Sequence, residues 1–236
     1  MALTEQVIMP GADYEDACDA IREKTGGTDL IKSGEMGGLI RGIEGENHDA
    51  EDAIISNTLE GAYFNDRVTN LTSYAFAFLT KCTHFQFQNV TSIGGWVFTS
   101  NSSNQRTELP KLKTIGNNQV FNNNKALKSV DVGFAAEIKA QTFLTCSALK
   151  VIILRTATIA ALANINAFNS SSLASGGVGC TILVPRSLIT EYPNATNWST
   201  IYSYGNCTFL AVEDYTKDGT TSGEPDWDKI ETELMT

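Results

Sequence analysis

TSIGGWVFTSNSSNQRTELPKLKTIGNNQVFNNNKALKSVDV, residues 91–132, contains one structural unit followed by most of the same unit again. The phenylalanine of this unit recurs with spacings of 22, 23, 22 and 25 residues, at Phe76, Phe98, Phe121, Phe143 and Phe168. A second apolar position lies five or six residues before each phenylalanine, at Leu71, Ile93, Ile115, Ile138 and Ala163. Such a period is typical of leucine-rich-repeat solenoids, whose repeats have about 20–29 residues.

Each repeat is expected to supply one short strand to a shared sheet. A unit of this size cannot bury an apolar face alone, so it must stack on its neighbours to form a continuous core. The strand pattern is clearest as Leu127-x-x-Val130-x-Val132 and Leu149-x-x-Ile152-x-Leu154. Because side chains alternate along a strand, six are predicted to point inward and those between them outward: Phe85, Phe87, Val130, Val132, Ile152 and Leu154.

The repeat motif resembles a known family. T-S-I-G-x-x-V-F (Thr91 to Phe98), T-I-G-N-N-Q-V-F (Thr114 to Phe121) and the following L-K-S-V-D-V are similar to the leucine-rich repeats of the BspA type, also called the Treponema pallidum type. The resemblance covers roughly residues 55–210. It implies an α/β leucine-rich-repeat solenoid of about five to six 22–25-residue repeats, with an N-terminal helix pair and a C-terminal capping segment. The motif is specific for fold and not for function.

The chain divides into four predicted parts. Residues 1–47 are interpreted as a helical module, with Asp13 and Ser33 as N-caps of helices over residues 14–24 and 35–43. The pair resembles modules of phage and prophage structural proteins of gut Firmicutes and has two readings, an attachment module or a cap or oligomerisation element of the solenoid. The BspA-type repeats follow at 53–184, a C-terminal cap at 185–212 and an acidic tail at 213–236.

The C-terminal parts carry their own local signals. Short helical turns are expected at 187–192 and 197–202, with Trp198 and Tyr202 available to cover the last repeat, and a final strand at 209–212. In the tail, residues 225–235 can form a short helix whose apolar side chains would contact a partner or a neighbouring domain. Those side chains are Trp227, Ile230 and Leu234.

Composition narrows the classes of partner. The formal net charge is −10 and the sequence pI is about 4.7, which argues against nucleic-acid binding and against docking on anionic lipid, since both need clustered Lys and Arg. No apolar stretch approaches the length of a membrane span, so direct membrane insertion is not expected. The first 20 residues lack the pattern of a signal peptide. The expected location is the cell surface or the extracellular space, with a phage virion as the alternative.

No chemistry of catalysis or cofactor binding is predicted. The chain has no G-x-S-x-G, H-E-x-x-H, P-loop or dinucleotide-binding motif. The five cysteines lack a C-x-x-C pattern and are interpreted as free, buried thiols, with neither disulfides nor zinc. His48 lies in the acidic linker of residues 46–52, and His84 is interpreted as a surface residue of the strand ladder. We therefore expect no catalytic residue, no metal site and no cofactor.

The strand register predicts where a partner would bind. Outward positions form a column of Gln86, Glu108, Asp131, Ile153 and Leu183, flanked by His84, Arg106, Ser129, Val151 and Thr181. Exposed contiguous apolar side chains often mark an interface, which makes Val151, Ile153 and Leu183 the more suggestive part. That patch has two other readings: it is covered by the C-terminal segment or by a second copy of the chain. The predicted partner-binding residues are Gln86, Glu108, Asp131, Val151, Ile153 and Leu183.

The resulting prediction is a non-enzymatic interaction protein that acts in adhesion or receptor recognition. The family resemblance implies binding to a host or bacterial surface protein or glycan. The alternative is a structural or receptor-binding component of a phage or prophage particle. A second copy of the chain is a further expected partner, so that the protein would form a homo-oligomer.

Overall fold

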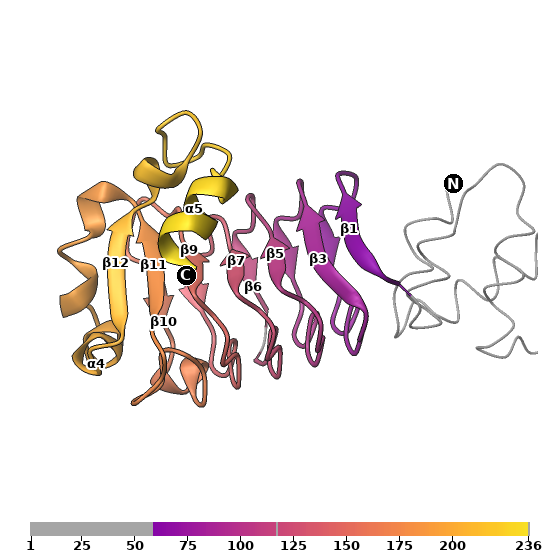
Figure 1. The fold of residues 1–236 in the computed structure, drawn as a ribbon, viewed down its shortest axis with the longest axis horizontal. Coiled ribbons are helices and arrows are strands. Elements are labelled where there is room, and N and C mark those ends of the chain that lie inside the picture. The colour runs from indigo at the N-terminus through magenta and orange to yellow at the C-terminus, as the bar shows by residue number, and fades with distance from the viewer. Residues whose placement is uncertain (1–58, 117, 236) are drawn as a thin grey trace, which may run out of the picture.

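The protein is described by a computed structural model, which places residues 59–116 and 118–235. These residues form a solenoid of parallel strands (Figure 1). The predicted helix pair at residues 1–47 lies outside the described residues.

One seven-stranded parallel sheet runs along the whole solenoid. Each turn of the chain contributes one strand and returns beneath the sheet, so neighbouring strands are about one repeat apart in sequence. The order is β1 (Gly61–Asn65), β3 (Cys82–Phe87), β5 (Arg106–Glu108), β7 (Ser129–Asp131), β9 (Val151–Ile153), β11 (Cys180–Val184) and β12 (Cys207–Ala211).

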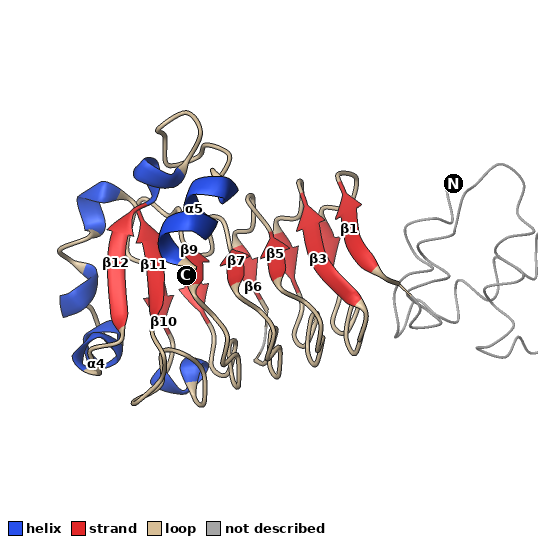
Figure 2. Cartoon of the chain, viewed as in Figure 1, coloured by secondary structure: helices blue, strands red, loops and turns tan. Residues whose placement is uncertain are grey.

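The opposite side of the solenoid has only two-residue strands. They are β2 (Asn70–Leu71), β4 (Ser92–Ile93) and β6 (Thr114–Ile115) in one group and β8 (Glu137–Ile138) and β10 (Ala161–Leu162) in another. The return segments are turns, with one 3-10 helix, η2 (Ile165–Phe168), within the described repeats. Figure 2 shows the remaining helices gathered at the C-terminal end. The α/β class overstates the helix content, because these repeats are too short and too turn-rich for a helix on the return path.

The second apolar column is confirmed except at its last member. Leu162, which is buried, pairs with Ile138, whereas the predicted Ala163 is exposed. The spacing from Phe143 to Phe168 is longer than the others, so the apolar position of the last repeat is displaced by one residue from the predicted one. A displacement of one residue along a strand moves a side chain to the opposite face.

The repeated phenylalanines form a stacked ladder in the core. Ring centroids lie 5.3 Å apart for Phe98 and Phe121, 5.4 Å for Phe121 and Phe143, and 5.5 Å for Phe143 and Phe168, with interplanar angles of 6°, 3° and 7°. The chain turns sharply around the first four rings, with left-handed residues two positions before and after each, such as Gln119 (φ 68°) and Asn123 (φ 61°) around Phe121. At Phe168, which ends η2, only the residue two positions after the ring, Ser170, is left-handed.

Buried polar side chains satisfy the carbonyl groups of these turns. Asn101 Nδ2 donates to the Phe76 carbonyl at 2.8 Å, and Asn124 Nδ2 donates to the Phe98 carbonyl at 2.6 Å. In the next repeat the thiol of Cys146 takes this position and lies 3.0 Å from the Phe121 carbonyl. The interpretation of the cysteines as free, buried thiols is confirmed for the four described ones, Cys82, Cys146, Cys180 and Cys207.

The C-terminal cap closes the open end of the core. It contains η3 (Arg186–Leu188), η4 (Tyr192–Asn194) and α4 (Trp198–Ser203). The Trp198 ring lies 5.9 Å from the Phe168 ring, and its Nε1 donates to the Ala160 carbonyl at 2.7 Å. Strand β12 then adds to β11 in parallel. The predicted turns and final strand are therefore present, although Tyr202 stays exposed.

The tail folds back over the outer face of the sheet. It consists of η5 (Val212–Tyr215), a loop closed by a bridge between Thr216 and Pro225, and α5 (Trp227–Leu234). Together with the sheet it forms a second, smaller apolar core of Val151, Ile153, Leu183, Val212, Tyr215 and Ile230. The short helix expected within residues 225–235 is present, and it packs on the chain's own sheet.

Candidate functional site

Two rows of side chains cross the outer face of the main sheet. Strand pairing places Gln86, Glu108, Asp131, Ile153 and Leu183 in one register, and His84, Arg106, Ser129, Val151 and Thr181 in the next. These are the two columns predicted from the alternation along each strand. Recognition on this face can therefore draw on equivalent positions from successive repeats.

Most of the predicted column is not accessible, contrary to its expected exposure. Gln86 is half-buried, and the other five predicted partner-binding residues are buried: Glu108, Asp131, Val151, Ile153 and Leu183. The tail accounts for the loss, because η5 and α5 pack on the three apolar residues. Of the readings of this patch, coverage by the C-terminal segment is the one that the structure shows.

A buried charge pair anchors the tail loop to the repeats. Arg155 Nη2 donates to Asp131 Oδ2 at 2.6 Å, and both side chains are 1% exposed. The same guanidinium donates through Nη1 to the carbonyls of Thr221 and Gly223, at 2.7 and 2.8 Å. The backbone N–H of Gly133 donates to Asp131 Oδ1 at 2.8 Å. With these bonds the buried charges are well satisfied, as a water-poor site requires.

A second arginine anchors the tail helix. The Arg106 guanidinium lies over the Trp227 ring, 4.4 Å from its centroid, and pairs with Glu231. Its Nη1 lies 3.9 Å from Glu108 Oε1, and Nε2 of His84 lies 2.7 Å from the same oxygen. Arg106 and His84 thus surround the buried carboxylate of Glu108 at the boundary between the covered and the open parts of the face.

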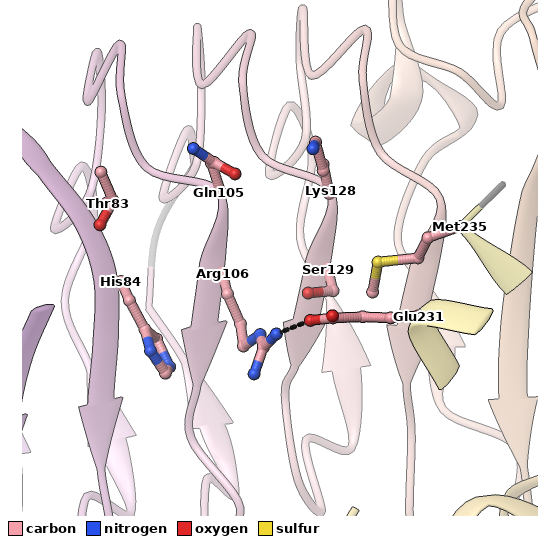
Figure 3. A pocket seen from close by; sticks show the side chains of 8 residues that line it. All are labelled: Thr83, His84, Gln105, Arg106, Lys128, Ser129, Glu231 and Met235. Atoms are coloured by element: carbon pink, nitrogen blue, oxygen red, sulfur yellow. Dashed lines mark hydrogen bonds and ion pairs between the residues drawn. The ribbon is translucent and has the colours of Figure 1, made fainter. Parts of the chain in front are cut away.

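A groove of about 500 Å³ lies where the tail helix meets strands β3, β5 and β7. Figure 3 shows residues of three successive repeats on its floor, with the residues of the tail on the other side. Its size is within the usual range of small-ligand sites. Its lining residues are Thr83, His84, Gln105, Arg106, Lys128, Ser129, Glu231 and Met235.

Two polar side chains of the groove have no partner among the described residues. Gln105 and Lys128 are exposed, and neither side chain makes a hydrogen bond or ion pair to the parts of the chain that the structure places. Their backbone groups are occupied: Lys128 N–H donates to the Gln105 carbonyl, and Gln105 N–H donates to the Thr83 carbonyl, both at 2.8 Å. The side chains of Gln105 and Lys128 are therefore available to bind a ligand, whereas their backbone N–H groups are not.

Within residues 59–116 and 118–235, no segment covers the sheet face next to the groove. On β1, Phe64 is 59% exposed, and its ring meets the His84 ring edge-on at 5.3 Å between centroids. Gln86 lies beside them on β3. An exposed aromatic ring at the edge of a polar groove is typical of a recognition surface, because it offers large contact area with few rotatable bonds.

Potential metal ligands and thiols among the described residues bear on the chemistry of the site. Within residues 59–116 and 118–235, no group of three or more His, Cys, Asp or Glu side chains is arranged to hold a metal ion. Burial raises the pKa of the Cys82 thiol to about 11 and that of Cys207 to about 12, so these thiols stay protonated at neutral pH. No helix of the described chain has the length and apolar character to cross a membrane.

Some site residues were not singled out from the sequence. Thr83, Gln105 and Lys128 lie one position before the predicted flanking column, so the repeat period could have indicated them. Glu231 and Met235 could not be placed in this way, because the contact between Arg106 and Glu231 joins residues 125 positions apart. No periodic signal connects the tail to the repeats.

Three comparisons with known proteins bear on this architecture. A family model described as BspA type leucine-rich repeat region matches residues 53–175 with six copies. No curated protein matches the sequence significantly. A solved structure described as the crystal structure of the pneumococcal vaccine antigen PcpA is similar with a TM-score of 0.36 and 14% identity, covering 65% of this chain and 42% of that one. The match thus spans less than half of the PcpA chain.

Proposed function

Because this chain belongs to the family of BspA-type leucine-rich-repeat proteins, we propose that it is a non-enzymatic interaction protein that recognises a partner through the open part of its strand face. The observation that carries the proposal is the continuity of the uncovered face at Phe64 and Gln86 with the groove beside α5. A surface built from several repeats suits wide, shallow recognition better than a closed catalytic pocket does.

The proposed location is the cell surface or the extracellular space, and the proposed partner is a surface protein or glycan of a host or of another bacterium. The acidic net charge supports a partner other than nucleic acid or anionic lipid. A homo-oligomer would present several copies of a shallow site and so raise its avidity.

A component of a phage or prophage particle is the second candidate. The sequence of residues 14–43 favours it, through its resemblance to modules of phage structural proteins. In that function the helical module would attach and the repeats would present the same strand face.

The test is binding of the purified chain to immobilised matrix proteins, mucin glycans and whole bacterial cells. A double variant, Phe64→Ala with Gln86→Ala, removes two side chains of the open face, and Tyr202→Ala changes another exposed aromatic side chain, on the C-terminal cap. The proposal expects binding that is lost in the double variant and kept in Tyr202→Ala. Binding that survives in the double variant would overturn recognition through this face, and absence of binding to every surface would favour the particle component.

A further inference from the structure

We propose that the groove between α5 and strands β3, β5 and β7 binds a carboxylate-bearing sugar. The inference rests on the proposed function and names the ligand class of the same face. It is carried by the composition of the groove, which brings hydrogen-bond donors of three successive repeats together with Lys128, a cation that has no ion-pair partner among residues 59–116 and 118–235.

Lys128 is the charged residue of the groove that is available to bind an anion, because the other charged side chains there contact one another. Glu231 is paired with Arg106, and Glu108 lies against both Arg106 and His84. Lys128 is exposed and has no carboxylate partner among the described residues. In a protein of net charge −10, an uncompensated ammonium beside a concave surface is a local site for a negative group.

The rest of the lining suits a ligand with several hydroxyl groups. Gln105 offers an amide donor and acceptor at the position next to Lys128, one strand away. His84 lies on the row below, as Figure 3 shows, and its side chain is partly exposed. Adjacent strands are about 4.8 Å apart. Equivalent side chains of neighbouring repeats can therefore each reach a different oxygen atom of one sugar ring.

The same features argue against an extended peptide. Strands β3, β5 and β7 are interior strands whose neighbours are already paired on both sides, so a peptide cannot add to the sheet there. Met235 is the one apolar residue of the lining, which leaves no set of pockets for alternate side chains. A compact, polar, acidic ligand fits these limits.

The tail helix completes the site as its second wall. Glu231 and Met235 line the groove from α5, and the Arg106 contacts with Trp227 and Glu231 hold that helix in place. The sugar therefore contacts the repeats on one side and the tail on the other. Glu231 acts as a positioning residue, since its carboxylate occupies Arg106 and leaves Lys128 for the ligand.

The experiment is calorimetric titration of the full chain with methyl glucuronide, N-acetylneuraminic acid, neutral methyl glucoside and a short glutamate-rich peptide. We expect at least one acidic sugar to bind and the neutral glucoside to bind more weakly. The two acidic sugars distinguish a uronic acid from a sialic acid as the source of the carboxylate. Lys128→Gln should lower the affinity about tenfold or more, as expected for loss of a charged hydrogen bond.

Lys125→Gln is the matched control, because Lys125 is an exposed lysine of the same repeat outside the groove. Circular dichroism checks that both variants are folded. The proposal is overturned if the glucoside binds as tightly as the glucuronide, if the peptide alone binds with the same dependence on Lys128, or if none of the sugars binds. In each case the proposed function is tested separately, by the binding of the Phe64 and Gln86 double variant to matrix proteins, mucin glycans and bacterial cells.

Discussion

Arg155 and Asp131 form a charge pair across adjacent turns of the solenoid, and the same arginine holds the tail loop through the carbonyls of Thr221 and Gly223. One buried guanidinium thus joins the repeats to a segment about 66 residues further along the chain. The pair therefore helps to hold the tail over the apolar part of the strand face.

Replacing Arg155 with leucine should lower the free energy of unfolding by roughly 3 to 5 kcal/mol, because the Asp131 carboxylate would remain buried without its counter-charge. Urea denaturation followed by circular dichroism measures the change. Lys217→Ala is the control, since it breaks only the exposed pair with Glu224 and should change the free energy of unfolding far less. Equal effects of the two substitutions would contradict the anchoring role.

Ile230→Asp should detach the tail helix while the repeats stay folded. Ile230 is fully buried against Val151, Ile153 and Leu183, and a carboxylate there has no partner. The expected result is faster proteolysis after Pro225 and stronger binding of a hydrophobic dye to the uncovered patch. Thr232→Asp, an exposed change on the same helix, should leave both readouts unchanged. If the dye binds both variants equally, the tail is not the cover.

Phe121→Ala should destabilise the solenoid by roughly 3 to 5 kcal/mol, the usual cost of removing a buried aromatic side chain. Phe121 is stacked between Phe98 and Phe143, so the cavity cannot be filled by solvent. Guanidinium denaturation gives the magnitude. Phe78→Ala, at an aromatic residue that is 57% exposed, should change stability little, and a comparable loss there would argue against the ladder as the main source of stability.

The stability of the protein should fall at alkaline pH in a way that depends on Cys146. Burial raises the pKa of this thiol from 9.0 to about 12, so above pH 9 the unfolded chain releases a proton that the folded chain retains. Below pH 9 the contribution is complete, and it is lost as the pH rises toward 12, at about 1 kcal/mol per pH unit. Denaturation curves between pH 8 and 11 for the wild type and Cys146→Ala provide the test. Parallel slopes for the two proteins would contradict the shift.

Periodicity was sufficient to predict the solenoid, its inward side chains and the two outer rows, because each of these repeats with the chain. The position of Leu162 was missed where the period widens and the column moves by one residue. The helix in the tail was also predicted from its apolar spacing. What periodicity could not supply was the surface on which that helix packs.

The accessible part of the strand face was predicted least well, because periodicity does not show where the tail packs. Asp131 and Leu183 were correctly placed on the outer side of their strands, but their exposure depends on a segment far away in sequence. Charged partners of the tail, Arg106 and Arg155, are single residues with no repeated counterpart. A contact made once leaves no pattern along a sequence.

The return of the tail also changes how cooperatively the protein folds. In a simple solenoid each repeat interacts only with its immediate neighbours, so the two ends can unfold almost independently. Here the contact between Arg106 and Glu231 bridges 125 residues and links a middle repeat to the end of the chain. The tail thereby couples the repeats from β5 to β12, and we expect this part of the protein to unfold as one unit.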